Sequence, residues 1–194
     1  MQFNENISRD DLNALPLQAF KKEIHVIDSL DKVEEAAEYL KKQKMLGFDT
    51  ETKPSFQKGQ KNKVALLQLS TEEHAFLIRI CKIGLPKPIA DILADENILK
   101  MGVAIRDDIK GLQKWQFFEP AGFIELSNFA KEFGIQASGL KKLCGIVMGF
   151  RISKSKQLSN WEEEYLEPGQ KTYGATDAWA GLMIYKKLKN IEEN

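Results

Sequence analysis

Two acidic residues near the start of the chain carry groups that could do chemistry. In the stretch MLGFDTET, Asp49 and Glu51 are two residues apart. The apolar and β-forming residues predict a strand, on which side chains two apart leave the same face, about 7 Å from each other. Such carboxylates repel each other and lose hydration unless cations lie between them, and Mg²⁺ or Mn²⁺ suit oxygen ligands. The alternative is a strand that has already ended, with both acids in a solvated turn.

A third acid is selected by the period of a predicted helix in the middle of the chain. Ile105, Ile109 and Leu112 recur at helical spacing and define its core-facing side. At about 100° per residue, Asp108 lies about 50° from the centre of that side, whereas Asp107 points about 150° away. Asp108 is therefore expected to face the sheet.

The last predicted helix, residues 169–191, adds a fourth acid. Its apolar stripe contains Tyr173, Asp177, Ala180, Ile184, Leu188 and Ile191. Asp177 thus lies in the middle of a core-facing stripe, where an unpaired carboxylate is costly. Tyr173 places a phenol one turn earlier on the same side. This pair is the strongest indication of chemistry in the second half of the chain.

These side chains need a scaffold, and the hydrophobic periodicity predicts one. The expected strands are 24–27, 45–52, 64–69 with its hairpin partner 74–78, and 98–103, while 123–126 is either a short strand or the start of a helix. The expected helices are 8–15, one opening at Asp31 with Glu34 at capping-box spacing, 86–93, 106–115, 128–133, 138–148 and 169–191. This order indicates an α/β domain with a mixed central sheet and flanking helices over residues 23–194, preceded by a tail or short helix over 1–22.

Charge gives no global attraction for nucleic acid, because 28 Lys and Arg balance 28 Asp and Glu in the 194 residues. Binding of a polyanion would therefore depend on local patches. The loop 53–63 holds four lysines and no acid, and 151–156 is also basic. The first loop is either a solvated surface loop, the more frequent case, or a rim that contacts phosphates.

The remaining reactive residues predict structural roles. Cys81 and Cys144 are far apart and in no CxxC spacing, so we expect reduced core thiols. His25 and His74 have no second His or Cys nearby in sequence and are expected to be structural. The polar N-terminus lacks the apolar core of a signal peptide, and no apolar run approaches membrane-spanning length. We therefore expect a cytoplasmic location and no membrane partner.

Four segments together resemble the DEDD superfamily of 3′–5′ exonucleases, in its tyrosine-bearing branch. They are GFDTET (47–52), KVALLQL (63–69), MGVAIRDDIKGL (101–112) and SNWEEEYLEPGQKTYGATDAWAG (159–181). The similarity covers residues 24–190; it is closest to the Werner-type exonuclease domain, with ribonuclease D more distant. The histidine branch carries His where this chain has Thr172. The resemblance implies a ribonuclease-H-like fold. It also implies an enzyme that releases nucleoside 5′-monophosphates from the 3′ ends of DNA or RNA, without a nucleotide cofactor.

The resemblance also implies roles for individual residues. Asp49 would bridge two divalent cations, Mg²⁺ or Mn²⁺, with Glu51 and Asp177 on one and Asp108 on the other. Tyr173 would orient the attacking water, because a phenol with a pKa of about 10 is a poor base at neutral pH. The expected nucleic-acid contacts are Phe48, Thr50, Thr52, Lys53, Lys58, Lys61, Arg151, Lys154 and Lys156, with Phe48 and Thr50 wedging the terminal nucleotide.

Two alternatives stay open on the sequence. One is a non-catalytic nucleic-acid-binding scaffold, which the presence of an acid at every ligand position disfavours. The other is an RNA-trimming exonuclease of the ribonuclease D type, which usually carries extra helical RNA-binding domains; none is expected here. Contacts to a 2′-hydroxyl have no clear sequence signature, so DNA and RNA are equally compatible with these residues. The oligomeric state is equally open.

Overall fold

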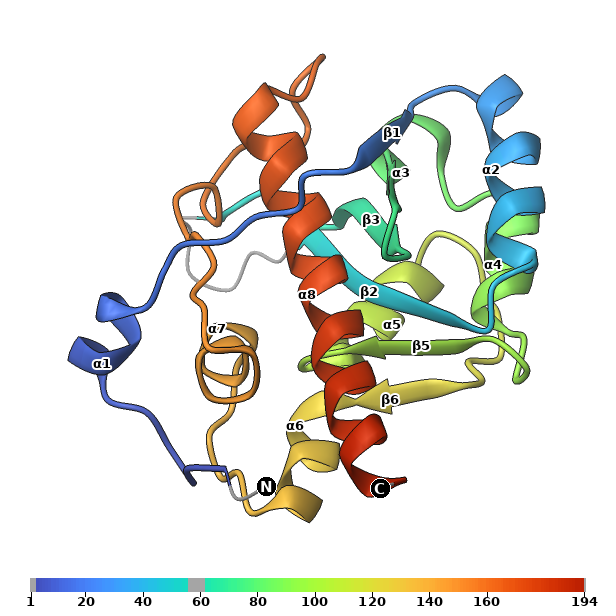
Figure 1. Cartoon of the computed structure of the whole chain (residues 1–194). Helices are drawn as coiled ribbons and strands as arrows, with labels where there is room; N and C mark the ends of the chain where they lie inside the picture. Colours follow the sequence, from blue (N-terminus) through green and yellow to red (C-terminus); the bar gives the residue numbers. More distant parts are fainter. Residues whose placement is uncertain (1–2, 56–61, 194) are drawn as a thin grey trace.

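One twisted sheet forms the centre of the molecule, as the computed structural model of residues 3–55 and 62–193 shows (Figure 1). The strands are β1 (Glu23–Ile27), β2 (Met45–Thr52), β3 (Val64–Ser70), β4 (His74–Ile78), β5 (Leu99–Gly102) and β6 (Phe123–Glu125). Their order across the sheet is β1-β4-β3-β2-β5-β6. β3 runs antiparallel to β2 and β4, whereas the β1–β4, β2–β5 and β5–β6 pairs are parallel. The predicted mixed sheet is confirmed.

Helices cover both faces of this sheet. They are α1 (Arg9–Ala14), α2 (Val33–Lys41), α3 (Ile80–Ile83), α4 (Lys87–Leu93), α5 (Ile105–Gln113), α6 (Leu126–Phe129), α7 (Leu140–Leu143) and α8 (Pro168–Glu192). The long helix α8 crosses one face, and α2, α4 and α5 pack on the other (Figure 1). The larger apolar core lies beneath α2, α4 and α5, and a second lies between α8 and the segment that contains α6 and α7.

Helix α8 approaches β2 unusually closely. A Cβ atom added at Gly47 would lie 1.9 Å from the backbone oxygen of Ala178, so only glycine fits there. A Cβ atom added at Gly174 would lie 3.2 Å from the Gln68 side chain, and one added at Gly181 would lie 3.2 Å from the backbone oxygen of Met101. The backbones of α8 and the sheet therefore touch, which brings the side chains of α8 over the end of β2.

Some helix boundaries differ from those the sequence predicts. A 3₁₀ turn (Leu30–Lys32) precedes α2. No side chain caps the N-terminus of this turn or of α2, so the capping box predicted for Asp31 and Glu34 is wrong. The single helix expected over 138–148 is α7 followed by a π-helical turn (Cys144–Met148). The helix expected over 128–133 is α6 followed by a 3₁₀ turn (Ala130–Phe133).

Residues 3–22 contain α1 and lie along the folded domain. Phe20 donates its backbone N–H to the Thr176 hydroxyl of α8, and Leu17 forms an isolated bridge with Arg151. In the described ranges 3–55 and 62–193, every helix is too short or too polar to cross a bilayer.

Candidate active site

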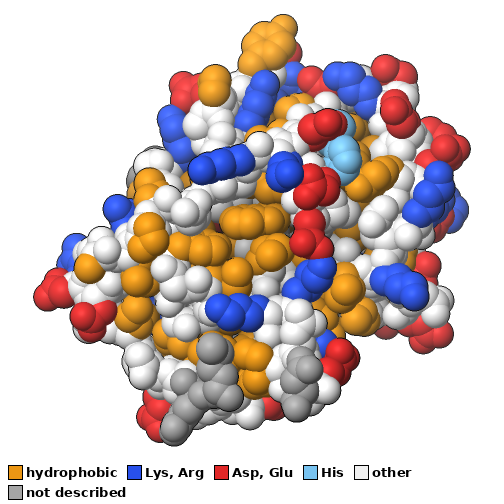
Figure 2. Space-filling model, viewed as in Figure 1, with side chains coloured by type: hydrophobic (Ala, Val, Ile, Leu, Met, Phe, Trp, Pro, Cys, Tyr) orange, Lys and Arg blue, Asp and Glu red, His pale blue; other side chains and the backbone are white. Residues whose placement is uncertain are grey.

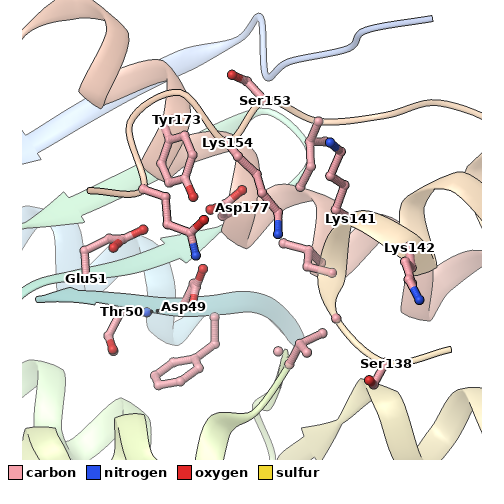
Figure 3. A pocket seen from close by; sticks show the side chains of 17 residues that line it. Asp49, Thr50, Glu51, Ser138, Lys141, Lys142, Ser153, Lys154, Tyr173 and Asp177 are labelled. Carbon is pink, nitrogen blue, oxygen red and sulfur yellow. Dashed lines mark hydrogen bonds between the residues drawn. The ribbon is translucent and has the colours of Figure 1, made fainter. Parts of the chain in front are cut away.

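Three of the four predicted acids meet at one point on the α8 side of the sheet. Carboxylate oxygens of Asp49, Glu51 and Asp177 all lie within 4.8 Å of one another. Asp49 and Glu51 leave the same face of β2, as strand alternation requires, and Asp177 reaches them from α8. Figure 3 shows the three carboxylates pointing toward a common space. The solvated-turn alternative for the first two acids is excluded, because both lie within a paired strand.

Asp108 approaches the same region from α5. Its carboxylate accepts a 2.5 Å hydrogen bond from the Thr50 hydroxyl on β2. The helix is anchored by Glu125, whose carboxylate accepts the N–H of Ile105 at 3.1 Å, next to a left-handed Ala104 with φ 60°. Asp108 is half-buried and Asp107 is exposed. The helical phase predicted for the two acids is therefore confirmed.

Tyr173 lies one turn before Asp177 on α8, and both side chains are buried. The phenol donates a hydrogen bond to the Asp177 carboxylate. Trp161, which is 0% exposed, packs its ring 5.9 Å from the Tyr173 ring and holds it in place. Burial, together with the charges of Asp177 and Glu51, raises the pKa of Tyr173, so the phenol stays protonated and can donate.

The crowded carboxylates are poorly stabilised without a cation. Burial raises the pKa of Asp49 far above its ordinary range, and the charges of Asp177 and Asp108 raise it further. Burial and the same neighbours raise the pKa of Glu51 to about 9. The pKa of Asp177 rises to about 7 through burial, although the bond from Tyr173 opposes this shift.

This donor set fits divalent cations. Oxygen donors on a half-buried concave site are the ligands that Mg²⁺ and Mn²⁺ prefer. Binding a doubly charged ion would replace the protons that the raised pKa values otherwise retain. Asp49, Glu51 and Asp177 could hold one ion together, while Asp108 lies close enough to interact electrostatically with Asp49.

Asp49, Glu51 and Asp177 line a cavity of about 410 Å³ whose opposite wall is basic. Lys154 reaches toward the carboxylates from the loop after the π-helical turn (Figure 3), and its charge lowers the pKa of Asp177. Lys141 and Lys142, from α7, line the same cavity. These two lysines are not among the predicted nucleic-acid contacts, although they begin the stretch 141–156, which contains five Lys or Arg and no acid.

The other predicted nucleic-acid contacts occupy different surroundings. Phe48 is 1% exposed and packs edge-on against Phe123, so in this conformation its ring is not open to a base. The Thr50 hydroxyl donates its hydrogen bond to Asp108, so it is not available to donate to a substrate. Thr52, at the end of β2, is exposed.

The basic residues expected at the rim also differ from one another. Lys53 pairs with Glu162 at 3.4 Å, and Lys156 pairs with Glu167 at 2.7 Å. Arg151 donates its Nε–H to the backbone oxygen of Leu15 and fastens the N-terminal segment. Lys58 and Lys61 lie outside the described residues. Of the predicted basic contacts that the structure describes, Lys154 is the one that lines the cavity.

The fold and the acidic cavity define a class: the chain has the architecture of a ribonuclease-H-like exonuclease domain of the DEDD superfamily. A family profile described as 3′–5′ exonuclease matches residues 24–193. The chain therefore belongs to the 3′–5′ exonuclease family, as its motifs predict.

Two relatives illustrate the similarity in sequence. The mouse bifunctional 3′–5′ exonuclease/ATP-dependent helicase WRN is 34% identical over 154 residues, covering 76% of this chain and 11% of that protein. The Drosophila melanogaster exonuclease 3′–5′ domain-containing protein 2 is 34% identical over 149 residues, covering 75% of this chain and 25% of that protein. The chain thus spans a quarter or less of these two relatives.

Solved structures share the fold. The exonuclease domain of Aedes aegypti Nibbler superposes with a TM-score of 0.79 at 25% identity, over 89% of this chain and 91% of that domain. Escherichia coli ribonuclease D, an exoribonuclease involved in structured RNA processing, gives a TM-score of 0.77 at 24% identity, over 88% of this chain and 45% of its own. Trypanosoma brucei ribonuclease D in complex with RNA U12 gives a TM-score of 0.76 at 21% identity, over 87% of this chain and 63% of its own.

Proposed function

We propose that this chain is a metal-dependent exonuclease that hydrolyses phosphodiester bonds from the 3′ end of DNA or RNA and releases nucleoside 5′-monophosphates. The observation that carries the proposal is the meeting of Asp49, Glu51 and Asp177 within 4.8 Å in an open cavity. One buried and two partly buried carboxylates this close together destabilise the folded state unless a cation compensates their charges. Membership of the 3′–5′ exonuclease family supports the same reaction.

The proposed site holds two divalent ions, Mg²⁺ or Mn²⁺, through the four acids. When bound, such ions lower the pKa of water and stabilise the leaving oxygen. Asp49 would be the central ligand, because the charges of Asp177, Asp108 and Glu51 all act on its carboxylate. Lys154 and Lys141 on the opposite wall would face the phosphates of the entering strand.

Tyr173 would position the attacking water instead of removing its proton. A raised pKa keeps the phenol protonated, and a protonated phenol can fix a water molecule by hydrogen bonding. Packing against Trp161 restricts the ring, so the hydroxyl is held above the carboxylates. Tyr173→Phe is expected to lower kcat while leaving the metal requirement unchanged.

The direct test is digestion of 5′-labelled DNA and RNA oligonucleotides by wild type and by Asp49→Asn. Wild type should shorten the strands stepwise from the 3′ end with Mg²⁺ or Mn²⁺ and should stop in EDTA. Asp49→Asn should lose this activity and keep its fold, because the volume hardly changes. Circular single-stranded DNA, which has no 3′ end, is the control for endonuclease activity. Equal rates for wild type and variant would exclude the proposed reaction.

Comparing the two oligonucleotides separates the alternatives. Digestion of RNA but not DNA would favour an RNA-trimming enzyme of the ribonuclease D type. Binding without digestion under all metal conditions would favour a non-catalytic scaffold.

A cytoplasmic location is also proposed, because Cys81 and Cys144 are both free thiols, as in a reducing compartment.

A further inference from the structure

A second cluster of metal-binding side chains lies at the β1 edge of the sheet. The parallel register of β1 with β4 places Glu23 beside His74 and His25 beside Phe76. Since alternate residues share a face, Glu23, His25 and His74 all leave the face that α2 covers. Asp49 leaves the opposite face, toward α8, and three strand spacings of about 4.8 Å separate its strand from β1. The two histidines, which are far apart in the sequence, therefore meet in the fold.

The three donor atoms form a triangle of suitable size for one metal ion. His25 Nε2 lies 3.0 Å from His74 Nδ1, and Glu23 Oε2 lies 3.8 Å and 3.5 Å from these nitrogens. The point equidistant from all three atoms is about 2.0 Å from each, which is the length of zinc–nitrogen and zinc–oxygen bonds. An ion slightly outside this plane would keep these lengths and present its fourth position to solvent.

We propose that Glu23, His25 and His74 bind a transition-metal ion, zinc foremost, at this edge. Two imidazoles and one carboxylate suit Zn²⁺, whereas Mg²⁺ and Mn²⁺ prefer sites made of oxygen donors. The active-site acids supply oxygen donors alone. The chain would therefore carry two metal sites of different selectivity on opposite faces of one sheet.

The surroundings hold the ligands ready. The His25 ring stacks on Phe76 at 4.8 Å, and Tyr39 of α2 packs its ring 4.9 Å from the His74 ring. Fixed rings lose little freedom when a metal binds. The side chains of Glu23, His25 and His74 are 72%, 37% and 27% exposed, so an ion can enter from solvent. Figure 2 shows histidine at the surface beside acidic side chains.

Neighbouring cations are engaged elsewhere. Lys22 pairs with Glu73 at 2.9 Å, and Lys32 pairs with Asp28 at 2.7 Å. The Glu23 carboxylate is left facing the two imidazoles. A bound ion would join β1 to β4 by side chains in addition to their backbone pairing, and would stabilise an edge strand.

The experiment uses the full chain without a polyhistidine tag. The sequence contains two histidines, both in this cluster, so histidine side-chain NMR reports on this site alone. Zn²⁺ is added in the presence of excess Mg²⁺, which occupies the acidic site. We expect both imidazole signals to shift together and Tm to rise. His25→Gln and Glu23→Gln should each weaken zinc binding by at least about tenfold.

Glu35→Gln is the matched control, because this exposed acid of α2 lines the same pocket as the two histidines but is not one of the three ligands. It should bind zinc as wild type does. Glu23→Gln changes a mostly exposed side chain and should therefore keep the fold. It remains an informative variant even if His25→Gln fails to fold. Unshifted imidazole signals, a shift of one histidine only, or wild-type affinity in both ligand variants would overturn the proposal. Exonuclease activity in Mg²⁺ is measured separately and is expected to be the same in His25→Gln as in wild type.

Discussion

The Thr50 hydroxyl holds the Asp108 carboxylate across the junction of β2 and α5 with a 2.5 Å hydrogen bond. Burial raises the pKa of Asp108 to about 6, and the bond from Thr50 opposes that rise. Thr50 follows Asp49 in the chain, and its side chain leaves the other face of the strand. Two neighbouring residues of β2 therefore have different roles. Asp49 is itself one of the acids, and Thr50 orients the acid Asp108 on α5.

Removing this bond should weaken metal binding. Thr50→Val keeps the shape of the side chain but lets the Asp108 carboxylate turn, and further raises its pKa. Partners that orient metal ligands typically contribute 10–100-fold to affinity, so the Mg²⁺ concentration for half-maximal activity should rise at least about tenfold. Thr50→Ser retains the hydroxyl and should stay near wild type. An unchanged Mg²⁺ requirement in Thr50→Val would contradict this role.

The two adjacent acids on α5 should behave very differently when replaced. Asp108→Ala should lower kcat by orders of magnitude, because it removes the acid that faces β2. Asp107 is exposed in the first turn of α5, where an acid contributes about 0.3–1 kcal/mol to helix stability. Asp107→Ala should therefore lower Tm slightly and leave kcat unchanged. Comparable losses of kcat would indicate that Asp107 orders a water molecule at the metal.

The metal-free protein should become less stable as the pH rises from about 6 to 9. The pKa values of Asp108, Asp177 and Glu51 are raised to about 6, 7 and 9. A carboxyl with a raised folded-state pKa favours the folded state while protonated. That stability is fully present below the unfolded pKa of about 4 and is lost as the pH rises through the folded pKa.

Thermal unfolding in EDTA measures this effect. Between pH 6 and 9, Tm should fall by at least about 2–4 °C, which corresponds to about 1 kcal/mol for a chain of this size. Adding Mg²⁺ at pH 8 should reverse most of the fall, because the ion compensates the carboxylate charges. Glu51→Gln, which removes the group that titrates at about 9, should flatten the upper part of the curve. A wild-type Tm independent of pH and Mg²⁺ would argue against crowded, ion-dependent acids.

Substrate binding should depend on the basic wall of the cavity. Replacing Lys141 and Lys154 together by Ala should weaken binding of a single-stranded oligonucleotide and lower the slope of log K against log salt by up to about 1.4. Fluorescence anisotropy with Asp49→Asn, which binds without cleaving, provides the measurement. Lys87→Ala is the control, because Lys87 pairs with Asp91 on α4 away from the cavity. Equal slopes for the two variants would mean that these lysines do not contact phosphates.

Periodicity predicted the parts of the site that regular elements position. The stripe of α8 correctly places Tyr173 and Asp177 on the buried side, and the phase of α5 correctly separates Asp108 from Asp107. In both cases the backbone geometry fixes the direction of the side chain, and the apolar neighbours identify the core. Strand alternation likewise places Asp49 and Glu51 on one face.

Contacts between distant segments could not be predicted in this way. The wedging of a terminal nucleotide expected of Phe48 requires an accessible ring, but β6 brings Phe123 against the ring. Lys53 and Lys156 looked like phosphate ligands, yet acids from other segments pair with them. His25 and His74 are 49 residues apart and meet because β1 and β4 pair in parallel. Periodicity within one element contains no information on such pairings.

The contact of Gly47 with Ala178 has a consequence for the time at which the site forms during protein synthesis. The ribosome produces β2 long before α8, so a growing chain carries Asp49 and Glu51 for most of its synthesis without Asp177 or Tyr173. Contacts between segments so far apart in sequence form late in folding. Since α8 packs directly on the backbone of β2, all its functional groups are placed by a single docking event. The acidic site is therefore incomplete until that event.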